Sequence, residues 1–246
     1  KDIFNDILSP SPGAEVSIIP VMQGEGLMKI SESDLPDCLP ILALRNAVLF
    51  PGSVYPITIG RDKSIRLIED AERGNTFIGA VPQNDLAVED PHKEDLYNFG
   101  TVAKIVKTLE MPDGTITAIL QGFRRFEIES VVEYDPYMLG RVRYHHDVVP
   151  ENDNQTRMIA ESLKEKATTI IRSSSLVPRE ALSALKGIDS FEFLVNFIAT
   201  TIEVENFMDK VELLQYADLK TRAMKLLSVL ETQVELQKIK QEINQK

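Results

Sequence analysis

Residues 39–60 read LPILALRNAVLFPGSVYPITIG, and this stretch decides the fold of the first half of the chain. It contains three short apolar runs, which are residues 41–44, 47–50 and 54–59. Short runs rich in Val, Ile and Leu and bounded by Pro, Gly or Asn predict strands. Because proline fixes φ and glycine tolerates positive φ, Pro51-Gly52 predicts a sharp turn. Such a turn would leave Phe50 at the rim of a sheet.

The strand pattern continues downstream. Residues 99–110 and 115–121 predict a hairpin, because Pro112 and Gly114 suit the turn between them. Residues 126–132 alternate with a period of two, and 138–147 give a last strand. The only helical period in this half lies at 62–73, with Asp62 as N-cap and Gly74 at the C-terminal end. Many short strands with one helix predict a small, mainly antiparallel pseudo-β-barrel.

From Pro150 the apolar period becomes helical. The predicted helices are residues 156–171, a short helix from Pro178 to Gly187, 189–202 with a capping box at Asp189 and Glu192, 207–215, and 218–246. The last one contains no Pro or Gly, but its apolar positions thin out beyond Val234. We therefore expect its end to leave the body as a stalk. The fold class is α+β.

Four segments follow from these patterns. Residues 1–37 mix small, acidic and turn-forming types and predict a flexible leader, with Val16, Ile18 and Ile19 as the material for a short edge strand. Residues 38–149 form the barrel-like domain, 150–217 a helical bundle, and 218–246 a long exit helix. The chain starts at Lys1 rather than Met, which suggests a piece of a longer protein.

Composition narrows the function classes. The chain has 246 residues, of which 43% are hydrophobic and 26% charged, as in ordinary globular proteins. A net charge of −11 argues against a general nucleic-acid binder, which needs a surplus of Lys and Arg. Cys38 is the only cysteine, so no disulfide framework is expected. No apolar run is long enough to span a bilayer, so no membrane partner is expected.

Several motifs together are similar to one known family. They are Leu39-Pro40-Ile41-Leu42, Leu44-Arg45, Phe50-Pro51-Gly52, Pro56, residues 60–65 (GRDKSI), 100–105 (GTVAKI), 112–114 (PDG) and 122–126 (GFRRF). In this order they resemble the start of the N-terminal, substrate-binding domain of bacterial Lon ATP-dependent proteases. Ala43 and Asn46 depart from that pattern, which has Pro and Asp there. The resemblance covers nearly everything from Leu39 onward.

The resemblance implies a PUA-like fold and a non-catalytic role for this fragment. The parent would be a cytoplasmic bacterial homohexamer that degrades damaged or regulatory proteins. Its ATP and Mg site and its Ser/Lys dyad would lie in later domains. The expected partners are unfolded or damaged protein substrates and further copies of the chain, with the fragment itself a monomer or dimer. The alternative is a stand-alone PUA-like module for a small ligand or RNA, which would need a basic, aromatic-lined groove.

The residues offer no catalytic site, cofactor site or metal site of their own. Gly74 and Gly79 have the outer spacing of a phosphate loop, but Ala80-Val81 stand where Lys and Ser or Thr are required. His145 and His146 would point to opposite faces of a strand, which does not suit one metal ion. No nucleophile and base converge in any recognisable motif.

Two groups of residues are candidates for binding. Phe50 with Pro51, and Met111 with Pro112, are apolar residues at turns that could dock unfolded chains, or could be covered by the leader or the helices. The second group is a cationic strip made of Arg124, Arg125, Arg141 and Arg143. Composition favours a structural role for the strip, in which these arginines pair across strands with Glu127, Glu129 and Glu133.

Overall fold

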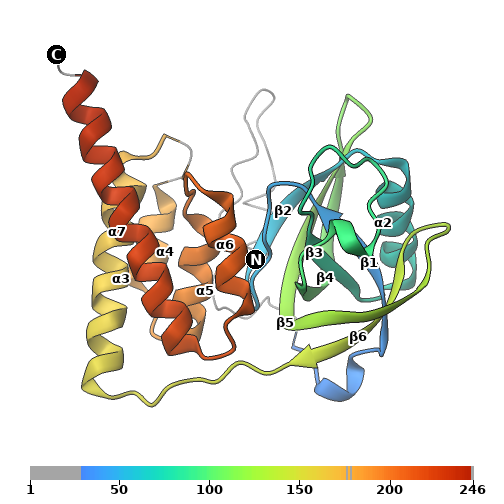
Figure 1. Ribbon diagram of the computed structural model, residues 1–246, viewed down its shortest axis with the longest axis horizontal. Coiled ribbons are helices and arrows are strands. Elements are labelled where there is room, and N and C mark those ends of the chain that lie inside the picture. The colour runs from blue at the N-terminus through green and yellow to red at the C-terminus, as the bar shows by residue number, and fades with distance from the viewer. Residues whose placement is uncertain (1–28, 176, 178, 245–246) are drawn as a thin grey trace, which may run out of the picture.

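The computed structural model describes residues 29–175, 177 and 179–244, and Figure 1 shows a sheet beside a bundle of helices. The elements are η1 (Glu32–Asp34), β1 (Cys38–Leu44), β2 (Val54–Ile59), α2 (Asp62–Gly74), β3 (Ile78–Pro82), η2 (Lys93–Asp95), β4 (Phe99–Glu110), β5 (Ile116–Glu133), β6 (Leu139–His145), α3 (Asn154–Ser173), α4 (Glu180–Lys186), α5 (Phe191–Thr201), α6 (Phe207–Gln215) and α7 (Leu219–Asn244). The predicted α+β class is confirmed.

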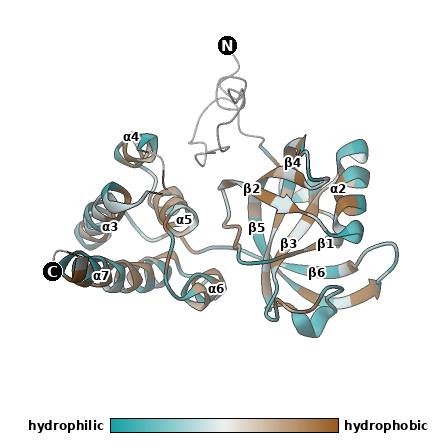
Figure 2. Ribbon diagram, turned by 90° about the horizontal axis from the view of Figure 1, so that it is seen from above, coloured by the Kyte–Doolittle hydropathy of each residue, from teal (hydrophilic) through white to brown (hydrophobic). Residues whose placement is uncertain are grey.

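In the described part of the chain, six strands form one sheet in the order β2-β5-β4-β3-β1-β6. An additional pairing of β5 with β6 closes part of the sheet into a ring, although not into a regular barrel. The pairings are antiparallel except that of β1 with β3, as expected for a mainly antiparallel sheet. Helices α3 to α7 stand together on the other side of the molecule, whereas α2 lies beside the sheet (Figure 2).

Strand β5 is the element on which the sheet depends, because it pairs with β2, β4 and β6. The predicted hairpin with β4 is confirmed, and Gly114 adopts the expected positive φ of 86°. The strands predicted at 115–121 and 126–132 are one continuous strand. Register shifts near its end break the period of two, so Val131 packs on the core and Val132 is exposed, whereas a strict alternation from Phe126 would place Val132 inside.

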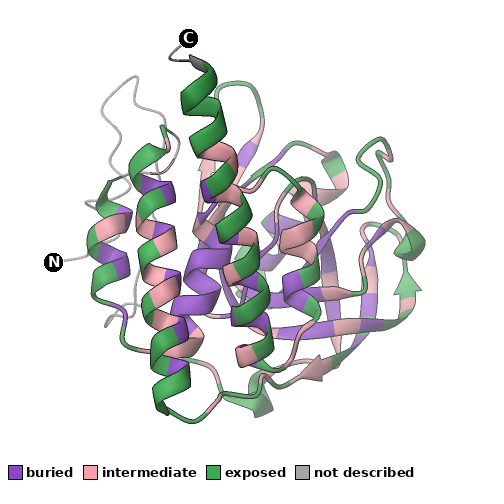
Figure 3. Ribbon diagram, turned by 60° about the vertical axis from the view of Figure 1, so that its left-hand side comes forward, coloured by how far each residue is buried: buried purple, intermediate pink, exposed green. Residues whose placement is uncertain are grey.

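The helical half follows the predicted periods closely. Helix α7 buries one face from Leu219 to Val234 and is mostly exposed beyond it, as Figure 3 shows. The predicted caps differ in detail. Arg61 rather than Asp62 precedes α2, and Asn75 rather than glycine takes the left-handed conformation after it, with φ 49°. Helix α5 is capped by Ser190, whose side chain accepts a hydrogen bond from the backbone N–H of Phe193.

The residues directly before β1 are held against the sheet. The Tyr144 hydroxyl donates to the carbonyl of Pro36 at 2.7 Å, and Leu35 packs against the sheet core. The part of the expected leader that includes Val16, Ile18 and Ile19 lies outside the described residues. Within the described ranges, no helix is both long and apolar enough to cross a membrane.

Candidate functional site

Phe50 and Pro51 are buried, so the expectation that they form an exposed apolar rim is wrong. The Phe50 side chain is 0% exposed and belongs to the core of the helical bundle. The turn is held down because the Gly52 N–H donates to Gly122 O at 2.9 Å and the Gly122 N–H returns to Ser53 O at 2.9 Å. The helices cover this turn, which was the alternative that the sequence left open. Phe50 therefore joins the sheet to the bundle.

Met111 and Pro112 are exposed at the tip of the β4–β5 hairpin, which projects from the sheet in Figure 1. The Gly114 N–H donates to Met111 O at 3.0 Å, and the Asp113 carboxylate accepts from the Thr115 N–H at 3.0 Å. These bonds fix the turn, so the Met111 side chain, 37% exposed, is presented on a rigid support. The tip is the one predicted apolar pair that remains accessible.

The four arginines of the predicted strip do not form a continuous cationic surface. Arg143 pairs with Glu127 at 3.0 Å and with Glu129 at 3.8 Å, as the cross-strand alternative predicted. Arg124 pairs instead with Glu32 of η1 at 2.8 Å. Arg141 is exposed on β6. Arg125 is 1% exposed, so its assignment to a surface strip is wrong.

The buried guanidinium of Arg125 belongs to a network that the sequence analysis missed. Asp147 accepts hydrogen bonds from Arg125 Nε at 2.5 Å and from Arg222 Nη1 at 2.9 Å. Arg222 also donates to Tyr216 O and to Asn196 Oδ1. Burial lowers the pKa of Arg222, and the Asp147 carboxylate opposes that shift. This Arg125–Asp147–Arg222 network ties β5, the linker to α3, and α7 together.

The histidines have local structural contacts. His145 Nε2 lies 2.7 Å from Glu127 Oε2, and His146 lies 3.5 Å from Glu32. Burial would raise the pKa of Glu127, but hydrogen bonds from Arg143 and His145 outweigh it, so the pKa is lowered. In the described part of the chain, no group of three or more His, Cys, Asp or Glu side chains could hold a metal ion.

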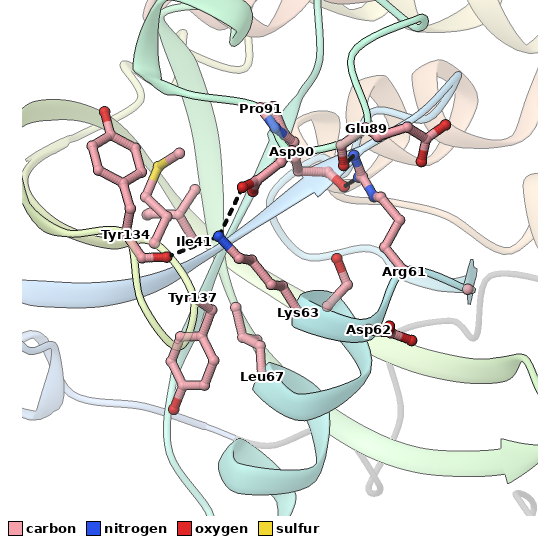
Figure 4. Close-up of a pocket in the computed structure, with 14 residues that line it drawn as sticks. Ile41, Arg61, Asp62, Lys63, Leu67, Glu89, Asp90, Pro91, Tyr134 and Tyr137 are labelled. Atoms are coloured by element: carbon pink, nitrogen blue, oxygen red, sulfur yellow. Dashed lines mark hydrogen bonds and ion pairs between the residues drawn. The ribbon is translucent and has the colours of Figure 1, made fainter.

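A pocket of about 390 Å³ lies between the start of α2, the turn at residues 134–138 and the loop at residues 84–98 (Figure 4). We call this loop the strap. The Lys63 ammonium reaches Asp90 of the strap at 2.8 Å and Asp135 at 3.3 Å. Hydrogen bonding to Asp90 raises the pKa of Lys63, so the Lys63 amine stays protonated at neutral pH. Both members of the Lys63–Asp90 ion pair line the pocket.

The strap has further anchors that no sequence pattern indicated. Arg61 donates to Glu89 O at 3.4 Å, and Gln83 Nε2 donates to Val88 O at 2.7 Å. The His92 ring stacks on Tyr134 with centroids 4.3 Å apart. The strap is thus a surface loop held along its length, and two cations that face it, Arg61 and Lys63, are matched by its carbonyls or carboxylates.

Comparison with known proteins matches most of this architecture to one family. Residues 38–232 match the family model of the ATP-dependent protease La (LON) substrate-binding domain. The Lon protease of Flavobacterium johnsoniae is 42% identical over 234 residues, which are 95% of this chain and 28% of that protein. The Lon protease of Cytophaga hutchinsonii is 38% identical over 232 residues, 94% of this chain and again 28% of the relative. The chain therefore spans little more than a quarter of these curated relatives.

Two solved structures share the fold. The N-terminal domain of the Mycobacterium avium complex Lon protease has a TM-score of 0.62 and 18% identity, with 79% of this chain and 98% of that chain covered. The Lon N-terminal domain protein from Xanthomonas campestris has a TM-score of 0.56 and 21% identity, with 78% and 97% covered. With the ring of strands, the helical bundle and the matched sequence together, the chain belongs to the family of Lon substrate-binding domains.

Proposed function

We propose that this chain is the substrate-recognition part of an ATP-dependent protease and that it performs no catalysis itself. Family membership over residues 38–232 carries the proposal, because the matched family is defined by substrate binding. The relatives extend far beyond the matched segment, so there is room in a longer parent for an ATPase and a Ser/Lys-dyad peptidase. The ligands are unfolded, damaged or regulatory proteins in the cytoplasm.

The mechanism rests on weak apolar contacts repeated in several copies. The hairpin tip with Met111 and Pro112 offers an adaptable apolar side chain on a fixed turn. Several tethered domains around a homohexameric parent raise the effective concentration of a captured chain, so each contact can be weak. Helix α7 would lead toward the ATPase ring, and its exposed end, with Ile239 and Ile243, would contribute to assembly.

The test is binding of a fluorescently labelled, permanently unfolded protein, compared with the same protein in its native state, at low and at high salt. Preferential binding of the unfolded form that persists at high salt is the expected result, because apolar contacts are not screened. Equal binding of the two forms, or none, would contradict the proposal. Turnover of casein by the pure chain would contradict its non-catalytic part.

A further inference from the structure

A groove runs along residues 96–99 where the sheet meets helix α6. It consists of two hollows of about 500 and 340 Å³, and both are bordered by Tyr97 and Asn98. The first is lined by residues of the strap alone. The second is also lined by residues of α6, which packs against β4 and stands nearest the strands in Figure 1. We call the two hollows together the Tyr97 groove. It is distinct from the hairpin tip and from the pocket of Figure 4.

The walls of the groove are held in place by contacts from both halves of the molecule. The Tyr97 hydroxyl donates to the sulfur of Met208 at 2.6 Å, and the Tyr97 N–H donates to Pro82 O at 2.9 Å. Met208 sits in the first turn of α6, where its N–H donates to the side chain of Asn206. Phe99 lies against the Arg125 guanidinium, 5.3 Å from its ring centroid. The groove is therefore preformed.

The floor toward α6 is apolar and adaptable. Met208 is 47% exposed, and Phe99 and Val211, which line the same hollow, pack at the edge of the bundle core. Methionine is flexible and polarisable, so it adapts to apolar side chains of different shapes. An aromatic ring beside it supplies further contact area. This hollow suits one large apolar side chain.

The rim of the groove is acidic. Its carboxylates are Glu94, Asp209 and Glu212, whereas its one lysine, Lys93, is directed to the carbonyl of Glu129 at 2.9 Å. Among the residues that the structure describes, neither Glu94 nor Asp209 forms an ion pair, while Glu212 faces Lys225 at 3.8 Å. An occupant that brings positive charge would gain attraction here. An anionic occupant such as RNA would be repelled.

We propose that the Tyr97 groove binds an extended polypeptide segment in which a large apolar side chain is flanked by Lys or Arg. The apolar side chain lies against Met208 and Phe99, and the cations face Glu94 and Asp209. Asn98 and Gln215 border the same hollow and carry amides suited to hydrogen bonds with an extended backbone. The inference rests on the proposed function and adds to it a place and a sequence preference.

The experiment measures fluorescence anisotropy of three labelled peptides with the full chain. One peptide has Phe flanked by Lys, the second has Glu in place of Lys, and the third has Ser in place of Phe. The groove variants are Met208→Ser and Asp209→Lys. The controls, Met158→Ser and Glu161→Lys, change an exposed methionine and an exposed glutamate on α3, at the far edge of the bundle (Figure 1).

We expect the Phe/Lys peptide to bind best, Met208→Ser to weaken it about three- to tenfold, and Asp209→Lys to weaken it about two- to fivefold. Asp209→Lys should also improve binding of the Phe/Glu peptide, which a loss of folding could not do. Both controls should bind like the parent chain. If the unfolded protein binds but the groove variants bind the peptides as well as the control variants do, the Tyr97 groove is not the binding site, and the proposed function of substrate capture stands. If neither the unfolded protein nor any peptide binds, both proposals fail.

Discussion

Removing the carboxylate charge of Asp147 tests the buried network most directly. Asp147→Asn keeps the shape of the side chain but leaves Arg125 and Arg222, 1% and 0% exposed, without their counter-charge. The new amide would also turn donors toward a guanidinium, at a place where Arg125 Nη2 and Asn196 Nδ2 already lack acceptors. The free energy of unfolding should fall by about 3–5 kcal/mol, because breaking a buried pair leaves a buried charge uncompensated.

Urea titration followed by far-UV circular dichroism measures this loss. For a chain of this size a loss of about 3–5 kcal/mol corresponds to a fall in Tm of roughly 6–20 °C. Asp90→Asn is the matched control, because it removes the same charge from the pair with Lys63, where the Asp90 side chain is 59% exposed. It should cost at most about 1 kcal/mol.

A double variant separates charge from packing. If the network acts as one unit, Asp147→Asn combined with Arg222→Met should cost less than the sum of the two single changes, by about 0.5–3 kcal/mol. Additive losses would mean that Asp147 and Arg222 act independently. A loss of less than about 1 kcal/mol for Asp147→Asn alone, similar to Asp90→Asn, would refute the reasoning.

Three further predictions concern the rest of the chain. Phe50→Ala should lower the free energy of unfolding by about 3–5 kcal/mol in the same titration, because it leaves a cavity where a side chain 0% exposed was packed. A loss below about 1 kcal/mol would mean that the turn is not packed as described. Truncation after Val234 should leave Tm almost unchanged in a thermal melt, since the removed part of α7 is mostly exposed, whereas a large drop would show that this end is packed. Burial lowers the pKa of Lys210 to about 8. Between about pH 8 and 10 the unfolded chain therefore binds a proton at Lys210 that the folded chain has lost, so the free energy of unfolding should rise with pH. The rise should reach up to about 1.4 kcal/mol per pH unit relative to Lys210→Met, which cannot titrate at this position. If the stability of the parent chain and that of Lys210→Met depend on pH in the same way, the lowered pKa of Lys210 is wrong.

The helices and strands could be predicted from sequence, because the spacing of apolar residues along each segment indicates its type. Helix α6 was predicted with its observed bounds, and the β4–β5 hairpin followed from the turn residues between its strands. What could not be predicted is which face of an element meets which other element. The turn at Phe50 looks like a sheet rim until the bundle is folded against it.

The errors at charged positions have a different origin. Sequence alone predicts Arg125 at the surface, because charged side chains are rarely buried and its partners, Asp147 and Arg222, lie far away along the chain. Arg222 did carry a signal, since it shares the apolar face of α7 with Leu219 and Ala223. An arginine at such a position predicts a buried acidic partner, although not which one. The strap anchors gave no such signal.

The way α7 begins has a mechanical consequence. Val148 is held on both sides of its peptide, with its N–H donating to Ala217 O at 2.8 Å and its carbonyl accepting from Leu219 N–H at 3.0 Å. One helical turn later, Arg222 reaches Asp147. A force applied along the C-terminal part of α7 would therefore not peel the helix away residue by residue. The force would act at the same time on the linker at Asp147 and Val148, on the Arg125–Asp147–Arg222 network and on β5. Traction at the C-terminal end would therefore move the sheet as one piece.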